Sequence, residues 1–373
     1  MIQRFGKSLE RAFRKLRPHL VPAYRQAFKS LVARGLLERR EGERIVCCDF
    51  SNSAIDAVGG RYYFSLVRDL IDAGYFPVFT ARRGTLSSFG TRSLKSLLLT
   101  ERMGVVRSYD DIQEPYFLIT DDSNANPQRA ERLVMVSYEW RLCQNANELA
   151  FPVFIHPWIA SGAASFCPPH LQDLRPTRLF FGGNTEEGKY DKNIIRDLYG
   201  MLSRREMLAE TMAATSPEMI CRPRDASSWL VSPEFHPVVF CETQHCKIPQ
   251  DRWLEALSRA DFFLACPGVG MPLCHNLIEA MTAGCVPILQ YADYLPPPLQ
   301  DGVNCLAFSD AASLREAVQT ALAMTPEAVR VMRANVRAHY EAHLAHGCFA
   351  HKLFSGTLEK RVLLLNDYRV PRK

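Results

Sequence analysis

The sequence predicts an α/β protein with two parallel-sheet domains and a basic amphipathic helical arm in front of them. The chain has 373 residues, which exceeds one ordinary core and favours two domains of about 150 residues. Strand–glycine–helix order begins near residue 44 and restarts near residue 177, after the proline-rich stretch Cys167-Pro168-Pro169. We therefore predict Rossmann-like domains at 41–165 and 166–345, and a C-terminal helix within 346–373.

The composition is that of an ordinary globular protein. Hydrophobic residues make up 47% of the chain. The sequence has no run of about 18 apolar residues, so it does not predict a membrane span. The basic N-terminus lacks the apolar segment of a signal peptide. The twelve cysteines are scattered without a CxxC pair, which favours a reducing compartment. We expect a cytoplasmic protein.

Residues 1–40 form the basic arm. Eleven Lys or Arg residues stand there against Glu10 and Glu38, a net charge of +9 within a total of +5. Apolar residues recur along the arm at three- and four-residue steps: Ile2, Phe5, Leu9, Phe13, Leu16 and Leu20. This pattern favours peripheral binding to the anionic inner face of a membrane. A helix that packs on the body is the alternative, and the rest of the chain does not favour nucleic acid.

The first domain opens with a βαβ unit. Residues 44–50 predict a strand, 62–73 have helical apolar spacing, and 75–80 predict a second strand. Gly59-Gly60 lies in the connection before the helix. Further strands are expected at 116–120, 133–137 and 151–155.

The second domain has the same design. The strand at 177–181 leads into Gly182-Gly183-Asn184, and a long helix is predicted over 192–214. A strand at 237–241 and a helix at 251–259 follow. Two further helices are expected at 311–323 and 326–345.

The segment 261–288 is the most informative stretch of the chain. Residues 261–266 read as a buried strand, and Pro267-Gly268-Val269-Gly270 allows the backbone to approach a ligand. A helix follows that carries Glu279 and ends at Gly284. An anion or ribose at the end of this strand would meet free backbone N–H groups, the positive end of the helix dipole and one carboxylate.

This segment resembles the donor-binding segment of GT-B glycosyltransferases, and most of all that of the exostosin-like family. The matching positions are Cys266-Pro267, Glu279-Ala280 and Gly284-Cys285-Val286-Pro287, whereas Cys274 and Asn276 replace the family's serine and arginine. Residues 178–184 and 301–308 resemble other parts of the same donor domain. The resemblance implies two Rossmann-like domains facing a cleft, with the donor on the C-terminal one and a final segment that crosses back to the first.

The resemblance also suggests donor-binding residues. Glu279 would accept hydrogen bonds from the ribose hydroxyls, and Lys189 would neutralise the leaving phosphate in place of a metal ion, with Arg196 as the competing cation. His275 and Asn276 would contact the base or phosphate, or cap the helix instead. The remaining candidates are backbone positions: Gly183, Gly268 and Gly270.

An inverting transfer also needs a general base in the first domain. The candidates follow predicted strands: Asp56, Asp122 with its neighbour Asp121, Glu139 and His156. The sequence does not choose between them, because each residue type is also common in caps and loops. Met271 stands where retaining GT-B enzymes often carry a second glutamate, which favours inversion.

No metal site or cofactor is expected besides a nucleotide-sugar co-substrate. His339, His343 and His346 share a helical spacing without an acidic ligand, and Cys241 with Cys246 lacks a completing pair.

The sequence thus predicts transfer of a sugar from a nucleotide-sugar to a hydroxyl of a saccharide or glycolipid acceptor, in surface glycan or lipopolysaccharide assembly. The alternatives are a non-catalytic nucleotide-sugar-binding partner and a nucleotide-sugar epimerase of the same fold.

Overall fold

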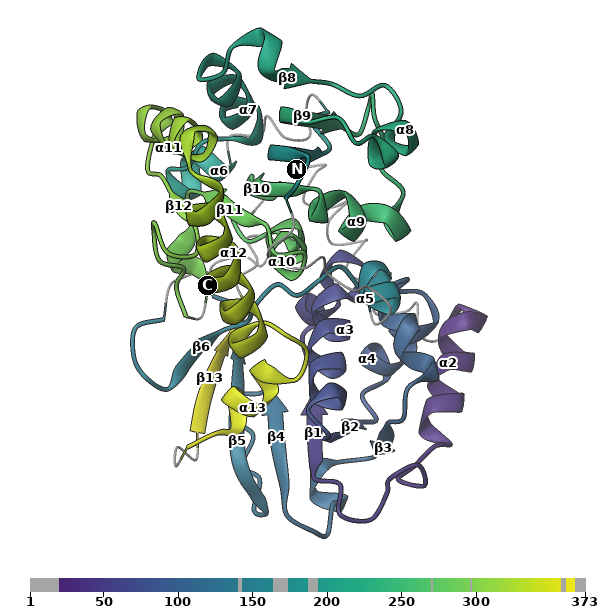
Figure 1. The fold of residues 1–373 in the computed structure, drawn as a ribbon. Coiled ribbons are helices and arrows are strands. Elements are labelled where there is room, and N and C mark those ends of the chain that lie inside the picture. The colour runs from purple at the N-terminus through teal and green to yellow at the C-terminus, as the bar shows by residue number, and fades with distance from the viewer. Residues whose placement is uncertain are drawn as a thin grey trace, which may run out of the picture. The chain divides into compact units, whose positions relative to one another are not determined.

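The chain folds into two compact α/β units (Figure 1). The computed structural model describes residues 20–139, 143–163, 174–186, 194–269, 271–295, 297–356 and 360–365. The first unit contains the described residues of 20–151 and 346–365, and the second contains those of 152–345. The division therefore falls 14 residues before the domain boundary expected at 165/166. The predicted fold class, two Rossmann-like parallel sheets with helices, is confirmed.

The first unit has a seven-stranded parallel sheet of order β3-β2-β1-β4-β5-β13-β6. Its strands are β1 (Ile45–Asp49), β2 (Phe76–Thr80), β3 (Gly104–Val106), β4 (Tyr116–Thr120), β5 (Ala130–Ser137), β6 (Glu148–Ala150) and β13 (Lys360–Leu364). All residues of β1, β2 and β4 are buried, as expected for central strands covered on both faces. The order 3-2-1-4-5 is that of a Rossmann sheet.

Four α-helices are described in the first unit. They are α2 (Pro22–Val32), α3 (Ala57–Asp72), α4 (Arg83–Ser87) and α13 (Cys348–Phe354). The regular part of α3 begins only after Val58, Gly59 and Gly60, which all have left-handed backbone conformations. The strand expected at 151–155 does not form, because the sheet ends at Ala150 and Pro152 cannot donate to a ladder.

The described part of the arm, residues 20–40, packs on the first unit. Ala27 and Leu31 are buried, and Arg34 donates to the carbonyl of Glu101 at 2.9 Å. The carbonyl of Ala23 lies 2.6 Å from where a Cβ on Gly90 would stand, so α2 sits tightly on this part of the chain. The alternative of a packed helix therefore holds for residues 20–40. Residues 1–19, which carry most of the predicted apolar stripe, lie outside the described residues.

The second unit has a six-stranded parallel sheet of order β12-β11-β10-β7-β9-β8. Its strands are β7 (Thr177–Gly183), β8 (Ile220–Cys221), β9 (His236–Glu242), β10 (Ala260–Leu264), β11 (Val286–Leu289) and β12 (Leu306–Ala307). Its α-helices are α5 (Pro157–Ala163), α6 (Ile194–Tyr199), α7 (Arg204–Ala213), α8 (Ala226–Val231), α9 (Trp253–Ser258), α10 (His275–Thr282), α11 (Ala311–Ala323) and α12 (Pro326–His343).

The long helix predicted over 192–214 is two helices, α6 and α7. Gly200 has a left-handed φ of 64°, which ends α6. Ser203 then starts α7 with a reciprocal capping box, in which Glu206 is the partner. The single-helix prediction was wrong because apolar spacing alone does not register a glycine break followed by a new cap.

The chain returns to the first unit after Ala345. α13 follows Gly347, and β13 then pairs in parallel with β5 and with β6. The expected C-terminal helix is therefore accompanied by a strand that the sequence pattern did not indicate. Among the residues that the structure describes, no helix is long and apolar enough to cross a membrane.

Candidate functional site

Ligands of open parallel sheets bind beyond the carboxyl ends of the strands, where the strand order reverses. In the first unit this point lies between β1 and β4, and in the second between β7 and β10. Both points carry polar or charged side chains, and each is described separately below.

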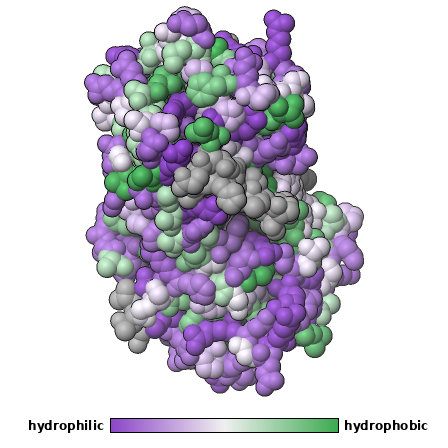
Figure 2. All heavy atoms as spheres, viewed as in Figure 1, coloured by the Kyte–Doolittle hydropathy of each residue, from purple (hydrophilic) through white to green (hydrophobic). Residues whose placement is uncertain are grey.

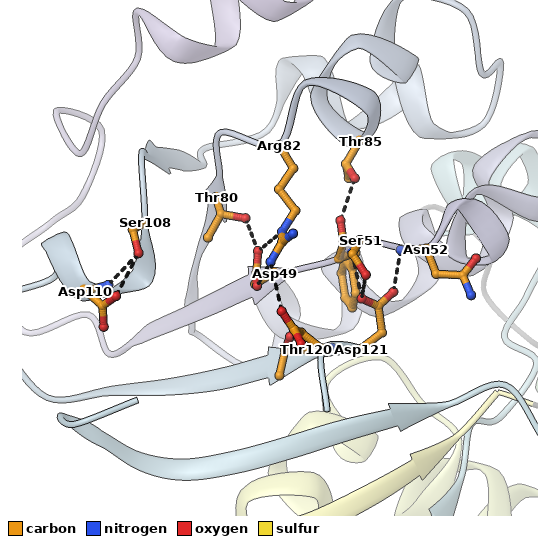
Figure 3. Close-up of polar contacts among 12 residues, drawn as sticks. Asp49, Ser51, Asn52, Thr80, Arg82, Thr85, Ser108, Asp110, Thr120 and Asp121 are labelled. Carbon is orange, nitrogen blue, oxygen red and sulfur yellow. Dashed lines mark hydrogen bonds and ion pairs between the residues drawn. The ribbon is translucent and has the colours of Figure 1, made fainter. Parts of the chain in front are cut away.

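At the first point, Asp49 ends β1 and is only 1% exposed. Its carboxylate accepts hydrogen bonds from Thr80 and from both Nε and Nη2 of Arg82, the latter at 2.6 Å (Figure 3). Two hydrogen bonds between a guanidinium and a carboxylate fix the orientation of the two planar groups relative to each other. The pair therefore holds Arg82 in place at the carboxyl ends of β1 and β2.

Asp121 anchors the loop after β1. Its carboxylate accepts from the backbone N–H groups of Ser51 at 2.7 Å and Asn52 at 2.9 Å (Figure 3). The Tyr138 hydroxyl donates to the same carboxylate at 2.9 Å. These bonds make Asp121 a support of the loop.

Asp122 is the predicted acid that remains accessible at this edge. Its side chain is 35% exposed and lies 3.6 Å from Nη2 of Arg82. One carboxylate oxygen accepts from the backbone N–H of Asn124 at 3.0 Å. Asp122 is thus oriented, partly exposed and next to a fixed cation.

Asp56, unlike Asp122, is buried inside the first unit. It is 4% exposed and pairs with the fully buried Lys95, whose Nζ lies 2.7 Å from its Oδ1. The Ser88 hydroxyl donates to its other oxygen at 2.7 Å. Because both oxygens are bound inside the first unit, this carboxylate supports the core and is not presented to a substrate.

Glu139 and His156 are the last two candidate bases. Glu139 is exposed, two residues beyond β5. His156 belongs to the second unit, not to the first as the prediction required. The reason is that the chain leaves the first sheet after β6, earlier than the expected strand at 151–155.

In the second unit, Glu279 of α10 is 1% exposed. Its Oε2 accepts from Nε1 of Trp253 at 2.6 Å, and its Oε1 accepts from the backbone N–H of His156 at 3.0 Å. The Trp253 ring lies where a Cβ on Gly182 would stand, at 2.7 Å, so glycine there makes room for this tryptophan. Glu279 therefore joins α9, α10 and the start of α5.

Arg204, the first residue of α7, joins the ends of β7 and β10. It is 5% exposed, its Nη1 donates to the carbonyl of Asn184 at 2.8 Å, and its Nη2 donates to that of Pro267 at 3.2 Å. A Cβ on Gly183 would lie 3.3 Å from Nη1. A Cβ on Gly268 would lie 2.9 Å from the carbonyl of Met271, too close for a side chain. The point of strand reversal thus combines two glycines, Gly183 and Gly268, with the buried cation of Arg204.

His275 and Asn276 are the first two residues of α10, and Cys274 occupies the N-cap position. The rings of His275 and His156 lie 5.0 Å apart between centroids. Arg196 is 60% exposed and pairs with Glu206. Lys189 and Gly270 lie outside the described residues.

Sequence reasoning missed Arg204, Trp253 and the Asp49–Arg82 pair. The capping box of Ser203 could have located the start of α7, and with it Arg204. No local pattern connects Arg82 to Asp49, since 33 residues separate them. Within the described ranges, no group of three or more His, Cys, Asp or Glu residues could hold a metal ion. His346 lies beyond the end of α12 and pairs with Asp72 instead.

No protein-family model and no curated protein sequence matches the chain. Among solved structures, sucrose-phosphate synthase from Thermosynechococcus elongatus is similar, with 13% identity, a TM-score of 0.43 and coverage of 83% of this chain and 98% of the other. A trehalose-6-phosphate synthase has 11% identity, a TM-score of 0.41 and coverage of 83% and 99%. The N-terminal domain of Candida albicans trehalose-6-phosphate phosphatase has 9% identity, a TM-score of 0.39 and coverage of 86% and 99%. TM-scores this low do not bear on activity.

Proposed function

We propose that the protein is a glycosyltransferase that moves a sugar from a nucleotide-sugar to a hydroxyl of a saccharide acceptor. The observation that carries this proposal is the point of strand reversal in the second unit. There Arg204 lies beside Gly183 and donates to the carbonyls of Asn184 and Pro267, the residue before Gly268.

A buried guanidinium at this place suits a leaving nucleoside diphosphate. Negative charge develops on the diphosphate as the glycosidic bond breaks, and a fixed cation in a water-poor site stabilises that charge. Arg204 meets this requirement because the carbonyls of Asn184 and Pro267 hold it. Lys189 and Arg196 remain proposed as alternative choices for a further cation at the leaving phosphate.

Glu279 is proposed to fix the donor site and to contact the ribose. Both of its oxygens already accept hydrogen bonds from the protein, so a ribose would share or replace one of them. His275 and Asn276 at the start of α10 are proposed to contact the base or phosphate.

The first unit is proposed to bind the acceptor, with Asp122 as the general base. Asp122 would take the proton of the acceptor hydroxyl, the hydroxyl oxygen would bond to the anomeric carbon, and the nucleoside diphosphate would leave with the electron pair. This single displacement inverts the configuration. Partial exposure next to Arg82 favours Asp122 over Asp56, and Glu139 is the second choice.

The nature of the acceptor and the membrane association are inferred from the sequence alone. The basic composition of residues 1–40 supports a membrane-borne glycan or lipopolysaccharide precursor as acceptor. Because residues 20–40 pack on the first unit, deletion of residues 1–19 is the appropriate test. The deletion should reduce binding to anionic vesicles, whereas unchanged binding would remove the membrane from the proposal.

The donor site is tested by thermal unfolding with UDP, GDP, CMP and ADP. A nucleotide present at 100 times its dissociation constant stabilises the folded state by about 2.7 kcal/mol. One nucleotide should raise the melting temperature, and Arg204→Met should reduce that rise, while Glu279→Gln tests the second contact. Arg222→Met, at an exposed arginine in the same unit, serves as the control. If no nucleotide shifts the transition, the donor assignment fails.

A non-catalytic nucleotide-sugar-binding partner is the second candidate. The observation that favours it is the commitment of both Glu279 oxygens to Trp253 and His156. Nucleotide binding without transfer to any saccharide acceptor would support it over catalysis.

A further inference from the structure

A pocket of about 470 Å³ lies in the second unit, at the carboxyl ends of β11 and β12 and beside the end of α6. Small-molecule sites commonly have volumes of about 300–1,000 Å³. The polar lining residues are Tyr199, Gln290, Asp293, Asp301 and Ser309, and Phe308 is among the apolar ones. Arg204, Gly268 and Glu279 are not among its lining residues, so the pocket shares none of the described residues proposed to bind the donor.

The side chain of Gln290 holds the pocket walls together. Its Oε1 accepts from the backbone N–H of Leu202 at 2.8 Å, and its Nε2 donates to the carbonyl of Ser309 at 2.5 Å. The backbone N–H of Phe308 also donates to the carbonyl of Leu289 at 3.1 Å. Three separate segments are therefore fixed around the pocket before any ligand enters.

The pocket is acidic. One oxygen of Asp301 accepts from the backbone N–H of Ala307 at 2.8 Å, which orients this carboxylate. Asp293 is exposed and has no hydrogen-bond or ion-pair partner among the residues that the structure describes. The lining residues that the structure describes include no Lys, Arg or His. Two carboxylates and no cation among the described lining residues disfavour a nucleotide or sugar phosphate as the occupant.

We propose that this pocket binds an amino sugar. Carboxylate, amide and hydroxyl groups offer hydrogen-bond partners for sugar hydroxyls, and the carboxylates attract a protonated amine. The lining also includes two aromatic residues, Tyr199 and Phe308, a residue type that suits the C–H groups of a pyranose. A metal ion is disfavoured because no set of three suitable ligands occurs in the described part of the chain. Binding of an amino sugar in this pocket is additional to the proposed transfer reaction and does not depend on it.

The test is a binding titration of the full chain, followed by saturation-transfer difference NMR, at a pH where the amine of glucosamine is protonated. Glucosamine should bind about fivefold more tightly than glucose, the gain expected for one charge pair near the surface. Glucose 6-phosphate should not bind. Cyclohexylamine, which has the ring and the charge but no hydroxyls, should bind more weakly than glucosamine.

Asp293→Asn should lower the affinity for glucosamine to that for glucose. Asp251→Asn is the matched control, because Asp251 is also an exposed aspartate of the second unit but does not line the pocket. Equal binding of cyclohexylamine and glucosamine, binding of glucose 6-phosphate, or equal effects of the two variants would each overturn the proposal. Absence of glucosamine binding would do so as well.

Discussion

At the scale of residues, Lys95 is a fully buried charge of the first unit. Its Nζ donates to Asp56, to the carbonyl of Thr85 at 2.7 Å and to the hydroxyl of Ser88 at 2.8 Å. The same nitrogen lies 3.6 Å from the centroid of the Tyr63 ring. Burial lowers the pKa of Lys95 to about 8, although Asp56 opposes this change. Burial of the ammonium group therefore costs free energy. Its hydrogen bonds to Asp56, Thr85 and Ser88 offset that cost.

The two members of this pair should depend on each other for their contribution to stability. Lys95→Met should destabilise the first unit by about 3–5 kcal/mol, because the Asp56 carboxylate then stays buried without its cation. The double variant Lys95→Met/Asp56→Asn should cost less than the sum of the two single variants. Urea unfolding of the four proteins measures this coupling. Additive losses would show that the two groups do not depend on each other.

This pair also shows what the sequence could not reveal about the candidate site. Position after a predicted strand marked Asp56, Asp122 with its neighbour Asp121, Glu139 and His156 as candidate bases without choosing between them. Their separate roles depend on partners far along the chain: Lys95 lies 39 residues from Asp56, and Tyr138 lies 17 residues from Asp121. Local spacing contains no information on such contacts, so the accessible acid could not be chosen.

At the scale of elements, α13 is attached to α3 through Asp69. Its Oδ1 accepts from the backbone N–H of Gly347 and its Oδ2 from that of Ala350, both at 2.6 Å. Gly347 is the N-cap of α13 with a left-handed φ of 87°, a conformation that favours glycine. A carboxylate from another helix thus serves as the cap that the N-cap residue itself cannot provide.

This attachment should weaken as the pH rises. Burial raises the pKa of Asp69 to about 7, and the two backbone hydrogen bonds act against this rise. The pKa of an aspartate in the unfolded chain is about 3.9, so the folded state holds the proton of Asp69 more tightly. The resulting stabilisation is complete below about pH 4 and is lost as the pH rises through about 7. Hydrogen exchange of α13, corrected for the intrinsic rate, should show less protection at pH 8 than at pH 5.5.

Asp69→Asn should remove this pH dependence. His346 near α13 acts in the opposite sense, because burial lowers its pKa and its contribution is lost as the pH falls. The variant separates the two groups, since it leaves His346 and Asp72 unchanged. A pH dependence that persists in Asp69→Asn would assign the effect to another group.

The elements themselves were largely predictable. Buried apolar runs located β1, β2, β4, β7 and β10 to within two residues, because parallel central strands have a continuous apolar pattern. β13 escaped prediction because Lys360 and Arg361 make its first half polar. Its partners, β5 and β6, lie more than two hundred residues earlier, and pairing at that distance leaves no periodic signal.

At the scale of the whole molecule, the described residues of the first unit form two separate stretches of sequence, whereas those of the second unit all fall between residues 152 and 345. Truncation after Ala345 would remove β13 from between β5 and β6. We expect the first unit of this variant to become sensitive to trypsin while the second unit stays resistant. Limited proteolysis with mass spectrometry measures both, and truncation after Leu365, which retains β13, is the control. A first unit that remains resistant without β13 would contradict this expectation.

The position of β13 has a consequence for how the protein is made. Translation releases residues 152–345 before residues 360–364, so the second sheet has all its strands available while the first still lacks one. Domains generally fold as units in the order in which they leave the ribosome. Here that order is reversed: the nascent chain can complete its later unit first, and the edges of β5 and β6 stay unpaired until β13 emerges. During that interval, the growing polypeptide offers two open strand edges with which other chains can pair.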